Sequence, residues 1–475
     1  MRCSKAWLPV IVLLFPLFAR SSDSSSVFPL HDFYKLVLAY HPLAKQANTL
    51  PQEAKNELRM VRGAFDPELK GGFDEKRLDG ANYWSVWQSS LSVPIWTGTD
   101  IKVAYDNAAG KEVNPSLSTP EGGLSYVGIT IPLGQGLLID QRRSTLRQAQ
   151  LALEAADAQK VVYINKLLLQ VTKDYWDWYF TYSRLLMHEE SLRLATIRYG
   201  AVRERVLLGD LPALDSLEAY IEVQNRLFTL NQSRLEFNNA RLVAANHLWN
   251  GQGQPVMPDS NLIPSITPED LELVSGEEMA TLLIGAGQDH PELISMDVKI
   301  GQLEIERRWA AEKLRPKLNV DYNFLRPGRY PWVSLEQPWT TNNNYKYGVQ
   351  FSVPLFLRQE RGKLGLVNIK RSQADFERQQ LAREIRTRVE VARNEMDALQ
   401  EQIQIQEEQL RNAELMLAGE QFRFDSGEGS VFLINARENA LIANRIRLAE
   451  LKSKFGKSKA ALYWSAGNLA GAMND

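Results

Sequence analysis

Cysteine is almost missing from this sequence, whose 475 residues include only Cys3. Because Cys3 lies in a basic segment ahead of an apolar run, we expect it to be neither a lipid-attachment site nor part of the mature chain. Disulfide bonds and thiolate chemistry are thereby excluded, and a secreted chain without them must be held together by other means. Histidine is also scarce, with five residues. His41 and His290 have no carboxylate or second histidine at ligand spacing, so we expect no metal site.

Motifs of catalytic sites are missing as well. The sequence has no nucleophile elbow, no phosphate-binding loop and no scaffold for paired carboxylates, so we expect neither an enzyme nor a bound cofactor. Its charges nearly balance, with 55 Lys and Arg residues against 57 Asp and Glu residues. No basic block stands out, and nucleic acid is therefore not expected as a partner.

Long apolar runs are confined to the amino terminus. A mean hydropathy of -0.30 argues against a polytopic helical membrane protein. The apolar residues 6–19 are too few to span a bilayer comfortably and follow two basic residues, which is typical of a signal peptide. We predict a signal peptide at residues 1–19, cleaved after Ala19, and a Ser-rich linker at 20–30. An amino-terminal membrane anchor is the alternative, which two prolines within the run disfavour.

The sequence does contain a duplication. Residues in its first half recur in its second half at a constant spacing. After the first predicted strand this spacing is smaller, because the first copy has an insertion. At a spacing of 249 residues the matches are His41 with His290, Pro42 with Pro291 and Pro67 with Pro316; at a spacing of 218 they are Arg143 with Arg361 and Gly209 with Gly427. The chain is therefore predicted to hold two copies of one structural unit.

The two copies have the same predicted order of elements. Repeat 1 covers residues 31–250 and repeat 2 residues 268–466, with a linker at 251–267 and a tail at 467–475. In repeat 1 we predict helices, strands at about 68–77 and 124–133 around an inserted hairpin at 84–110, a long helix at 141–208 and a return helix at 213–249. In repeat 2 we predict helices within 268–314, strands at 316–325 and 345–355, a long helix at 358–425 and a return helix at 430–466.

The predicted long helices are the most unusual elements. No Gly or Pro interrupts residues 143–199 or 366–418, which predicts helices roughly 80 to 85 Å long at about 1.5 Å per residue. Their apolar residues recur at steps of three and four, the pattern of coiled-coil packing. Residues 174–179 are rich in aromatic side chains and follow the same spacing, so we interpret them as packing residues.

The predicted strands alternate strictly between apolar and polar residues, as residues 317–324 and 345–353 show. This pattern fits a transmembrane β-barrel around water, although an ordinary half-buried antiparallel sheet would show it too. Since two strands per copy cannot close a barrel and open edges are not tolerated in lipid, several chains must contribute strands. The insertion, with Trp84, Trp87 and Trp96, could be an extracellular hairpin or two further spanning strands. Residues 326–344 are expected to form a long exposed loop.

The ends of the strands carry a family resemblance. Residues 131–133 (IPL) and 352–356 (SVPLF) each lead into a long helix, and they resemble the TolC family of outer-membrane factors. The helix turns at 207–211 and 424–428 are similar as well, and the likeness covers nearly the whole mature chain. It implies an α+β membrane protein in which three chains form a transmembrane barrel of twelve strands, four per chain or possibly more, continued by a helical coiled-coil barrel in the periplasm.

The function that this resemblance implies is transport. The protein is expected to be a homotrimeric channel in the outer membrane of a Gram-negative-type cell, surrounded by outer-membrane lipid, and the exit duct of a tripartite efflux pump or a type I secretion system. Its partners would be a periplasmic adaptor (membrane fusion) protein and an inner-membrane pump or ABC transporter. The alternative is a periplasmic coiled-coil structural or adaptor protein that acts by protein contacts only.

The resemblance also implies two sets of site residues at the helix turns. The tips expected to contact the adaptor are Leu208, Gly209, Asp210, Leu211, Ser426, Gly427 and Glu428. The periplasmic gate is expected at Asp215, Arg423, Phe432 and Asn435. Asp215 stands at a tip aspartate position of the family, whereas Phe432 and Asn435 replace aspartates. Arg423 could pair with Asp215 across the tip, and an apolar constriction at Phe432 is the alternative to an acidic ring.

Overall fold

The computed structural model describes residues 26–257, 262–328 and 344–472. The predicted signal peptide and its cleavage site, most of the Ser-rich linker, most of the loop predicted at 326–344 and the end of the tail lie outside these residues. The chain divides into two compact units. Unit 1 consists of Met1–Val37, Asp174–Leu271 and Gln406–Ser453, and unit 2 consists of Leu38–Lys173, Glu272–Ile405 and Lys454–Asp475.

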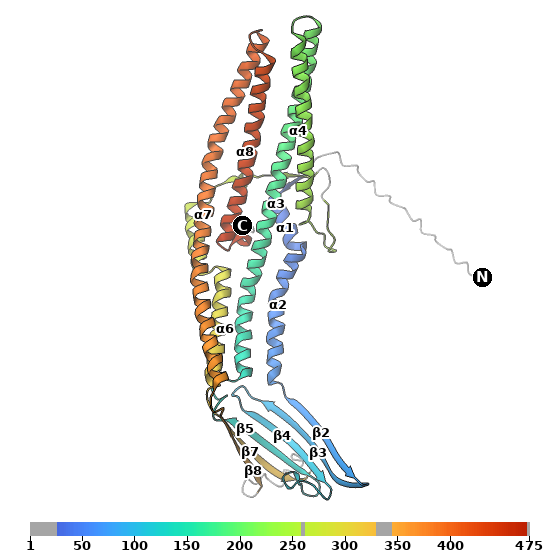
Figure 1. Ribbon diagram of the computed structural model, residues 1–475, viewed down its shortest axis with the longest axis vertical. Coiled ribbons are helices and arrows are strands. Elements are labelled where there is room, and N and C mark those ends of the chain that lie inside the picture. The colour runs from blue at the N-terminus through green and yellow to red at the C-terminus, as the bar shows by residue number, and fades with distance from the viewer. Residues whose placement is uncertain (1–25, 258–261, 329–343, 473–475) are drawn as a thin grey trace, which may run out of the picture. The chain divides into compact units, whose positions relative to one another are not determined.

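Unit 2 contains one antiparallel sheet of six strands (Figure 1). In sheet order these are β2 (Glu68–Leu78), β3 (Ala81–Pro94), β4 (Asp100–Ala109), β5 (Leu124–Pro132), β7 (Lys317–Pro327) and β8 (Tyr345–Ser352). The inserted residues form β3 and β4, which pair between β2 and β5. The insertion thus adds two strands to the sheet of each chain.

A two-residue turn joins β2 to β3. Its residues Asp79 and Gly80 both have positive φ angles, 50° and 77°. A type I′ turn requires this backbone at both central positions, and Asp-Gly is among the sequences that adopt it most readily. The turn and a shift of the register between Lys76 and Arg77 together pair Phe73 with Trp87, and these two rings lie 6.3 Å apart.

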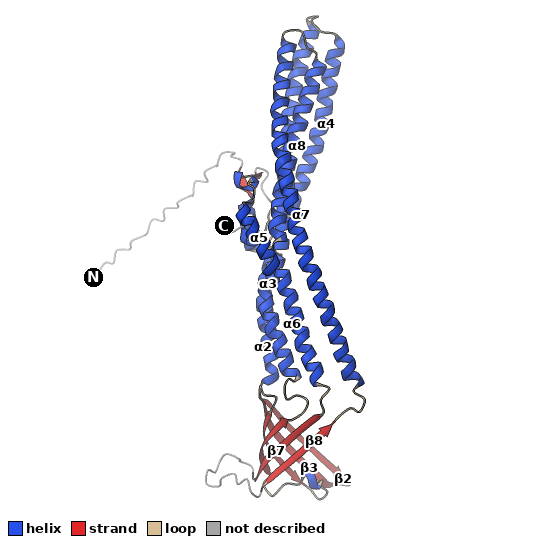
Figure 2. Cartoon of the chain, turned by 90° about the vertical axis from the view of Figure 1, so that its left-hand side faces the viewer, coloured by secondary structure: helices blue, strands red, loops and turns tan. Residues whose placement is uncertain are grey.

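Helices adjoin one end of this sheet in unit 2. They are α2 (Pro42–Arg62), α6 (Pro291–Glu312) and the adjoining parts of α3 (Gln141–Leu207) and α7 (Arg358–Asp425), all visible beside the strands in Figures 1 and 2. The unit also holds α5 (Gly276–Gln288), the end of α8 (Val431–Ser465) and α9 (Leu469–Ala472). None of the helices in the described parts of the chain combines the length and hydropathy needed to cross a lipid bilayer.

The duplicated His-Pro pair begins equivalent helices in the two repeats. The Nδ1 atom of His41 accepts a hydrogen bond from the amide of Leu43 at 3.1 Å, and Nδ1 of His290 accepts one from the amide of Glu292 at 3.2 Å. A side chain in this position satisfies an amide that the first helical turn leaves unpaired, and the following proline has the φ angle that the turn needs. Both histidines are therefore helix caps, and the described residues contain no metal-binding cluster.

Unit 1 consists mainly of two helical hairpins. One is formed by the second part of α3 with α4 (Ala213–Ala245), and the other by the second part of α7 with most of α8, as Figure 1 shows. The helices α3 and α7 are continuous over 67 and 68 residues. This continuity follows from the long stretches without Gly or Pro, since both residues disfavour the interior of a helix.

The aromatic residues of α3 form the core of unit 1 beside α1 (Leu30–Tyr40). Tyr175, Trp176 and Trp178 are almost completely buried, and the ring of Phe33 lies 5.6 Å from that of Tyr175. The interpretation of this segment as packing residues is confirmed. Burial raises the pKa of the Tyr175 hydroxyl, which lies 2.7 Å from the carbonyl oxygen of Phe28 and 2.6 Å from that of Ser265.

Those two carbonyls belong to a small parallel sheet that the sequence did not suggest. Its strands β1 (Ser26–Pro29) and β6 (Leu262–Ser265) fall in segments predicted to be linkers, residues 20–30 and 251–267. The prediction that these segments are only linkers was wrong. A strand of four residues is too short to show a periodic pattern, and its hydrogen bonds come from a partner more than 200 residues away.

Candidate functional site at the helix turns

The turn between α3 and α4 has the backbone of a Schellman motif. The amide of Gly209 donates a hydrogen bond to the carbonyl of Val206 at 3.0 Å, and the amide of Asp210 donates one to the carbonyl of Arg205 at 2.9 Å. Gly209 has a φ of +86°, which only glycine adopts without strain. The sequence Leu-Gly-Asp thus ends the helix at a defined residue.

The turn between α7 and α8 repeats this motif at the equivalent positions. The amide of Gly427 donates to the carbonyl of Phe424 at 3.0 Å, the amide of Glu428 donates to the carbonyl of Arg423 at 2.9 Å, and the φ of Gly427 is +81°. The duplication therefore extends to the hydrogen bonds of the two turns. Both glycines are positions where any other residue would be strained.

The residues at the turns differ in exposure. Leu208 is 78% exposed, and Gly209, Asp210, Ser426, Gly427 and Glu428 are exposed as well. Leu211 instead packs on a buried cluster below the turns, formed by Val202, Ala219 and Val431. This cluster takes one residue each from α3, α4 and α8, so it holds the two hairpins together just beneath the turns.

The predicted gate residues lie on different sides of the helices. Phe432 is 64% exposed, whereas Asn435, three residues further along α8, is buried. Asp215 lies in the first turn of α4, where the helix dipole favours a negative charge. Arg423 lies 4.0 Å from Glu420 of its own helix, and within the described residues no ion pair joins it to Asp215. The pairing of Arg423 with Asp215 stays a prediction, and so do the roles of the other gate residues.

A buried ion-pair network, which the sequence analysis missed, lies next to Asn435. Glu438 of α8 is 2% exposed, and its Oε2 atom accepts a hydrogen bond from Nη1 of Arg226 on α4 at 2.9 Å. Its Oε1 atom contacts Nη2 of Arg198 on α3, which also donates through Nη1 to the side chain of Asn435. One carboxylate thus connects three helices.

Arg226 donates further hydrogen bonds to its surroundings. Its Nε atom donates to Glu222 at 2.8 Å and its Nη1 atom to the carbonyl of Ser191 at 2.9 Å. Two arginines therefore face two glutamates, and the formal charges of the network cancel. A buried charge is tolerated only when it is paired and hydrogen-bonded, which is the case here.

Burial also affects the protonation of the network. Desolvation, with a smaller contribution from the positive charge of Arg226, lowers the pKa of Arg198 to about 10, although Glu222 opposes this change. Arg198 therefore remains charged at neutral pH. The network acts as a fixed electrostatic link between the α3–α4 hairpin and α8.

The sequence held a signal for this network. Val431, Ile434, Glu438 and Leu441 recur at steps of three and four along α8, and all four are buried. A glutamate in such a stripe interrupts an otherwise apolar coiled-coil face. An ionic residue at a core position requires a buried partner, but the sequence pattern alone does not say which residue provides it.

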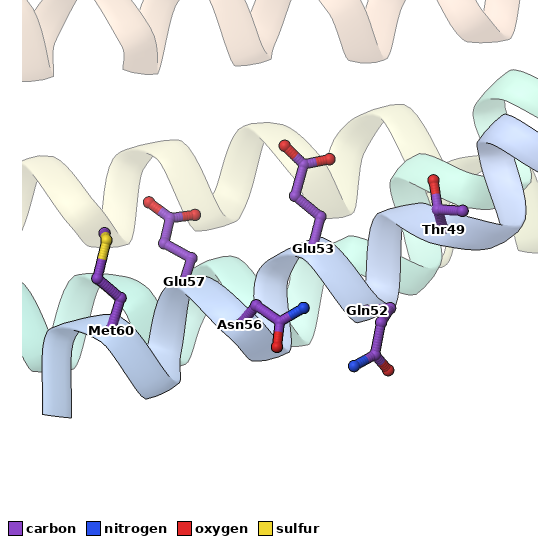
Figure 3. A pocket seen from close by; sticks show the side chains of 6 residues that line it. All are labelled: Thr49, Gln52, Glu53, Asn56, Glu57 and Met60. Carbon is purple, nitrogen blue, oxygen red and sulfur yellow. The ribbon is translucent and has the colours of Figure 1, made fainter. Parts of the chain in front are cut away.

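Elsewhere, the described residues include a shallow, open hollow. It has a volume of about 690 Å³ and lies along α2, where Figure 3 shows that all six lining side chains come from this one helix. Glu53 and Glu57 point to one side of the helix, and Gln52 and Asn56 point away from them. A single exposed helix face does not bring catalytic groups together around a substrate.

A family model matches the second half of the chain in sequence. The family model described as outer membrane efflux protein matches residues 286–468, nearly the whole of repeat 2. These residues match the outer membrane efflux protein family in sequence. The description of the matched family, an outer membrane efflux protein, agrees with the resemblance seen at the strand ends and helix turns. No curated protein matches the chain in sequence.

Solved structures share the fold of this chain over most of its length. The CmeC outer membrane channel of Campylobacter jejuni is similar with a TM-score of 0.65 at 12% identity, covering 94% of this chain and 88% of CmeC. The open state of the MtrE outer membrane channel of Neisseria gonorrhoeae gives 0.66 at 14% identity, covering 92% and 89%. The outer membrane protein VceC of Vibrio cholerae gives 0.63 at 15% identity, covering 92% and 96%.

Proposed function

We propose that three copies of this chain form the outer-membrane exit duct of a tripartite efflux pump or a type I secretion system. The observation that carries this proposal is the two-sided sheet of unit 2. On β7, Val320, Tyr322 and Phe324 share one face with Ile131, Ile129 and Val127 of β5, their partners in the register. The opposite face of β7 carries Asn319, Asp321 and Asn323. An apolar outer face and a polar inner face are what a barrel around water needs.

Closing such a barrel requires several copies of the chain. The sheet ends at β2 on one side and β8 on the other, and neither edge strand pairs with a further strand among the described residues. Unpaired backbone amides and carbonyls cost several kcal/mol each in lipid, so the edges must pair with those of neighbouring copies. A homotrimer is the assembly that the family resemblance supports.

The helix turns are the surface proposed for the partners. Leu208, Asp210, Ser426 and Glu428 are exposed on short turns whose backbones are held by the Schellman hydrogen bonds. We infer that a periplasmic adaptor protein contacts these turns, with Gly209, Leu211 and Gly427 shaping them, and that an inner-membrane pump or ABC transporter supplies substrate. Energy and substrate choice then come from the partners, because the channel provides only a path through the membrane.

The gate is proposed beside the same turns. Phe432 is exposed on α8, next to the buried Asn435, and could form an apolar constriction when three copies meet. Asp215 and Arg423 are the charged candidates at this level of the hairpins. The alternative of a periplasmic structural or adaptor protein leaves the apolar face of the sheet without a surface to cover it.

Fractionation and electrical recording test this proposal. We expect the protein in the outer-membrane fraction as a trimer that dissociates on heating in detergent, and we expect the purified trimer to conduct ions across planar lipid bilayers. Recovery as a soluble periplasmic protein without conductance would contradict the channel and favour the adaptor alternative. Cross-linking from Asp210→Cys or Glu428→Cys, followed by mass spectrometry, would identify the adaptor.

A further inference from the structure

We propose that the inserted hairpin β3–β4 is part of the transmembrane barrel, so that three copies of this chain close a barrel of eighteen strands instead of twelve. The number follows from six strands in the sheet of each chain and three copies. This inference rests on the channel function proposed above and changes the size of the channel that results.

The hairpin is paired along its length with β2 and β5, two strands that would belong to the barrel whether it had twelve or eighteen strands. β3 pairs with β2 at eleven positions and with β4 at ten, and β4 pairs with β5 at seven. In the described sheet, β2 and β5 lie on opposite sides of the hairpin. A hairpin outside the membrane would leave β2 and β5 to pair with each other, as β7 and β8 do in repeat 2.

The outward row of side chains continues through the inserted strands. One row of directly paired residues crosses all six strands, and every member is apolar or aromatic. From β2 to β8 it consists of Leu69, Leu91, Val103, Val127, Phe324 and Tyr345. A hairpin surrounded by water would not need an apolar residue at the two inserted positions, whereas a lipid-facing strand does.

The adjacent row, on the other face of the sheet, continues in the same way. Each of its members is polar, charged or glycine. From β2 to β8 they are Glu68, Ser92, Lys102, Gly128, Asn323 and Lys346. The inserted strands therefore share both faces of the sheet with the four strands expected from the family.

The turn between β3 and β4 lies at the helix end of the sheet. Both Nη atoms of Arg142, in the first turn of α3, donate to Oδ1 of Asp100 at the start of β4, at 3.0 and 3.1 Å. Next to it, Gly98 has a φ of +90° and lies so close to α3 that a Cβ atom would come within 2.7 Å of the Arg143 guanidinium. The hairpin consequently runs from the Asp79 turn to the start of the helices, the full height of the sheet.

The number of strands also permits closure. All neighbouring strands are antiparallel, so with six strands β2 and β8 run in opposite directions and can pair between copies as antiparallel neighbours. Figure 1 shows these two strands at opposite margins of the sheet. Since barrel diameter grows about linearly with strand number, eighteen strands give a barrel about 1.5 times as wide as twelve.

Single cysteines can test whether the inserted strands face lipid. In the full-length Cys3→Ser protein, we would compare Leu91→Cys and Ser92→Cys of β3 with Phe324→Cys and Asn323→Cys of β7, which lie in the same two rows. The trimers are labelled with bimane in bilayers. Lipids with brominated acyl chains should quench the labels at positions 91 and 324, and a membrane-impermeant maleimide should react with unlabelled cysteines at positions 92 and 323 only.

The controls in β7 separate the two proposals. Quenching at position 324 without quenching at position 91 would overturn the eighteen-stranded barrel and leave the channel function standing. If neither position is quenched, the channel itself is contradicted. Val103→Cys and Lys102→Cys of β4 provide the same comparison in the second inserted strand and replace the β3 pair if those variants do not assemble.

Discussion

Arg226 of α4 and Glu438 of α8 form a buried ion pair between elements that lie more than 200 residues apart in the sequence, with 2.9 Å between Nη1 and Oε2. Their side chains are 5% and 3% exposed. Glu438 also contacts Arg198 of α3, so this carboxylate fixes how the two hairpins of unit 1 pack together. Any movement that separates the hairpins must expose or break this pair.

Removing the charge of Glu438 should loosen unit 1. The Glu438→Gln substitution keeps the shape of the side chain but leaves the buried guanidinium of Arg226 and the partly buried one of Arg198 with less negative charge. Breaking a buried pair in this way costs about 3–5 kcal/mol. We expect a lower melting temperature and faster proteolysis of the hairpins. The matched control is Glu428→Gln at the exposed turn, and equal stability of the two variants would show that the network has no structural role.

Shortening Phe432 should widen an apolar constriction. Phe432→Ala is expected to raise the single-channel conductance of the trimer in planar bilayers, because the exposed ring would be removed from the proposed gate. Phe228→Ala on α4 removes a ring of similar exposure away from the turns and serves as the control. An unchanged conductance of Phe432→Ala would exclude this residue from the gate.

Substitution by alanine should change the stability in opposite directions at Gly427, in the turn after α7, and at Gly419, within α7. Gly427→Ala places a Cβ atom at a φ of +81° and should destabilise the turn by about 1–2 kcal/mol. Gly419→Ala lies in the helix interior, where an added Cβ atom meets no other group, and should stabilise the helix by up to about 1 kcal/mol. Thermal unfolding and amide hydrogen exchange at the turn would reveal this difference in sign. Two changes of the same sign would contradict the assigned backbone.

His290 should make unit 2 sensitive to mild acid. Burial lowers the pKa of His290 from its usual value of 6.5, Arg388 lowers it further and Glu292 opposes this. The folded state favours the neutral ring of His290. The contribution of this ring to stability is therefore complete above about pH 6.5, and it is lost as the pH falls below that value towards the pKa of His290 in the folded protein. We expect the melting temperature to decrease between pH 7.5 and 5.

The His290→Asn variant tests the origin of this pH dependence. Asparagine is also a good helix cap but does not titrate, so the variant should retain α6 and show a smaller decrease of the melting temperature over the same range. A decrease as large as that of the unaltered protein would assign the pH dependence to other groups.

Local sequence patterns predicted much of the fold. The alternation of residues 317–324 predicted β7, and the stretch without Gly or Pro at residues 143–199 predicted α3. The two turn glycines were visible from their spacing. In the site, by contrast, Glu438 was recognisable only as an unusual core residue, because its partners Arg198 and Arg226 come from other helices.

The amino-acid sequence by itself determined the duplication, the period of each strand and helix, and the glycines that end α3 and α7. These features depend on the side chains and backbone preferences of neighbouring residues, which a linear pattern records. Only the tertiary structure decided that the insertion lies inside the sheet, between β2 and β5, and that Glu438 joins two arginines. Strand pairing and buried ion pairs depend on which distant segments meet, and alternation with a period of two is the same whichever strand lies alongside.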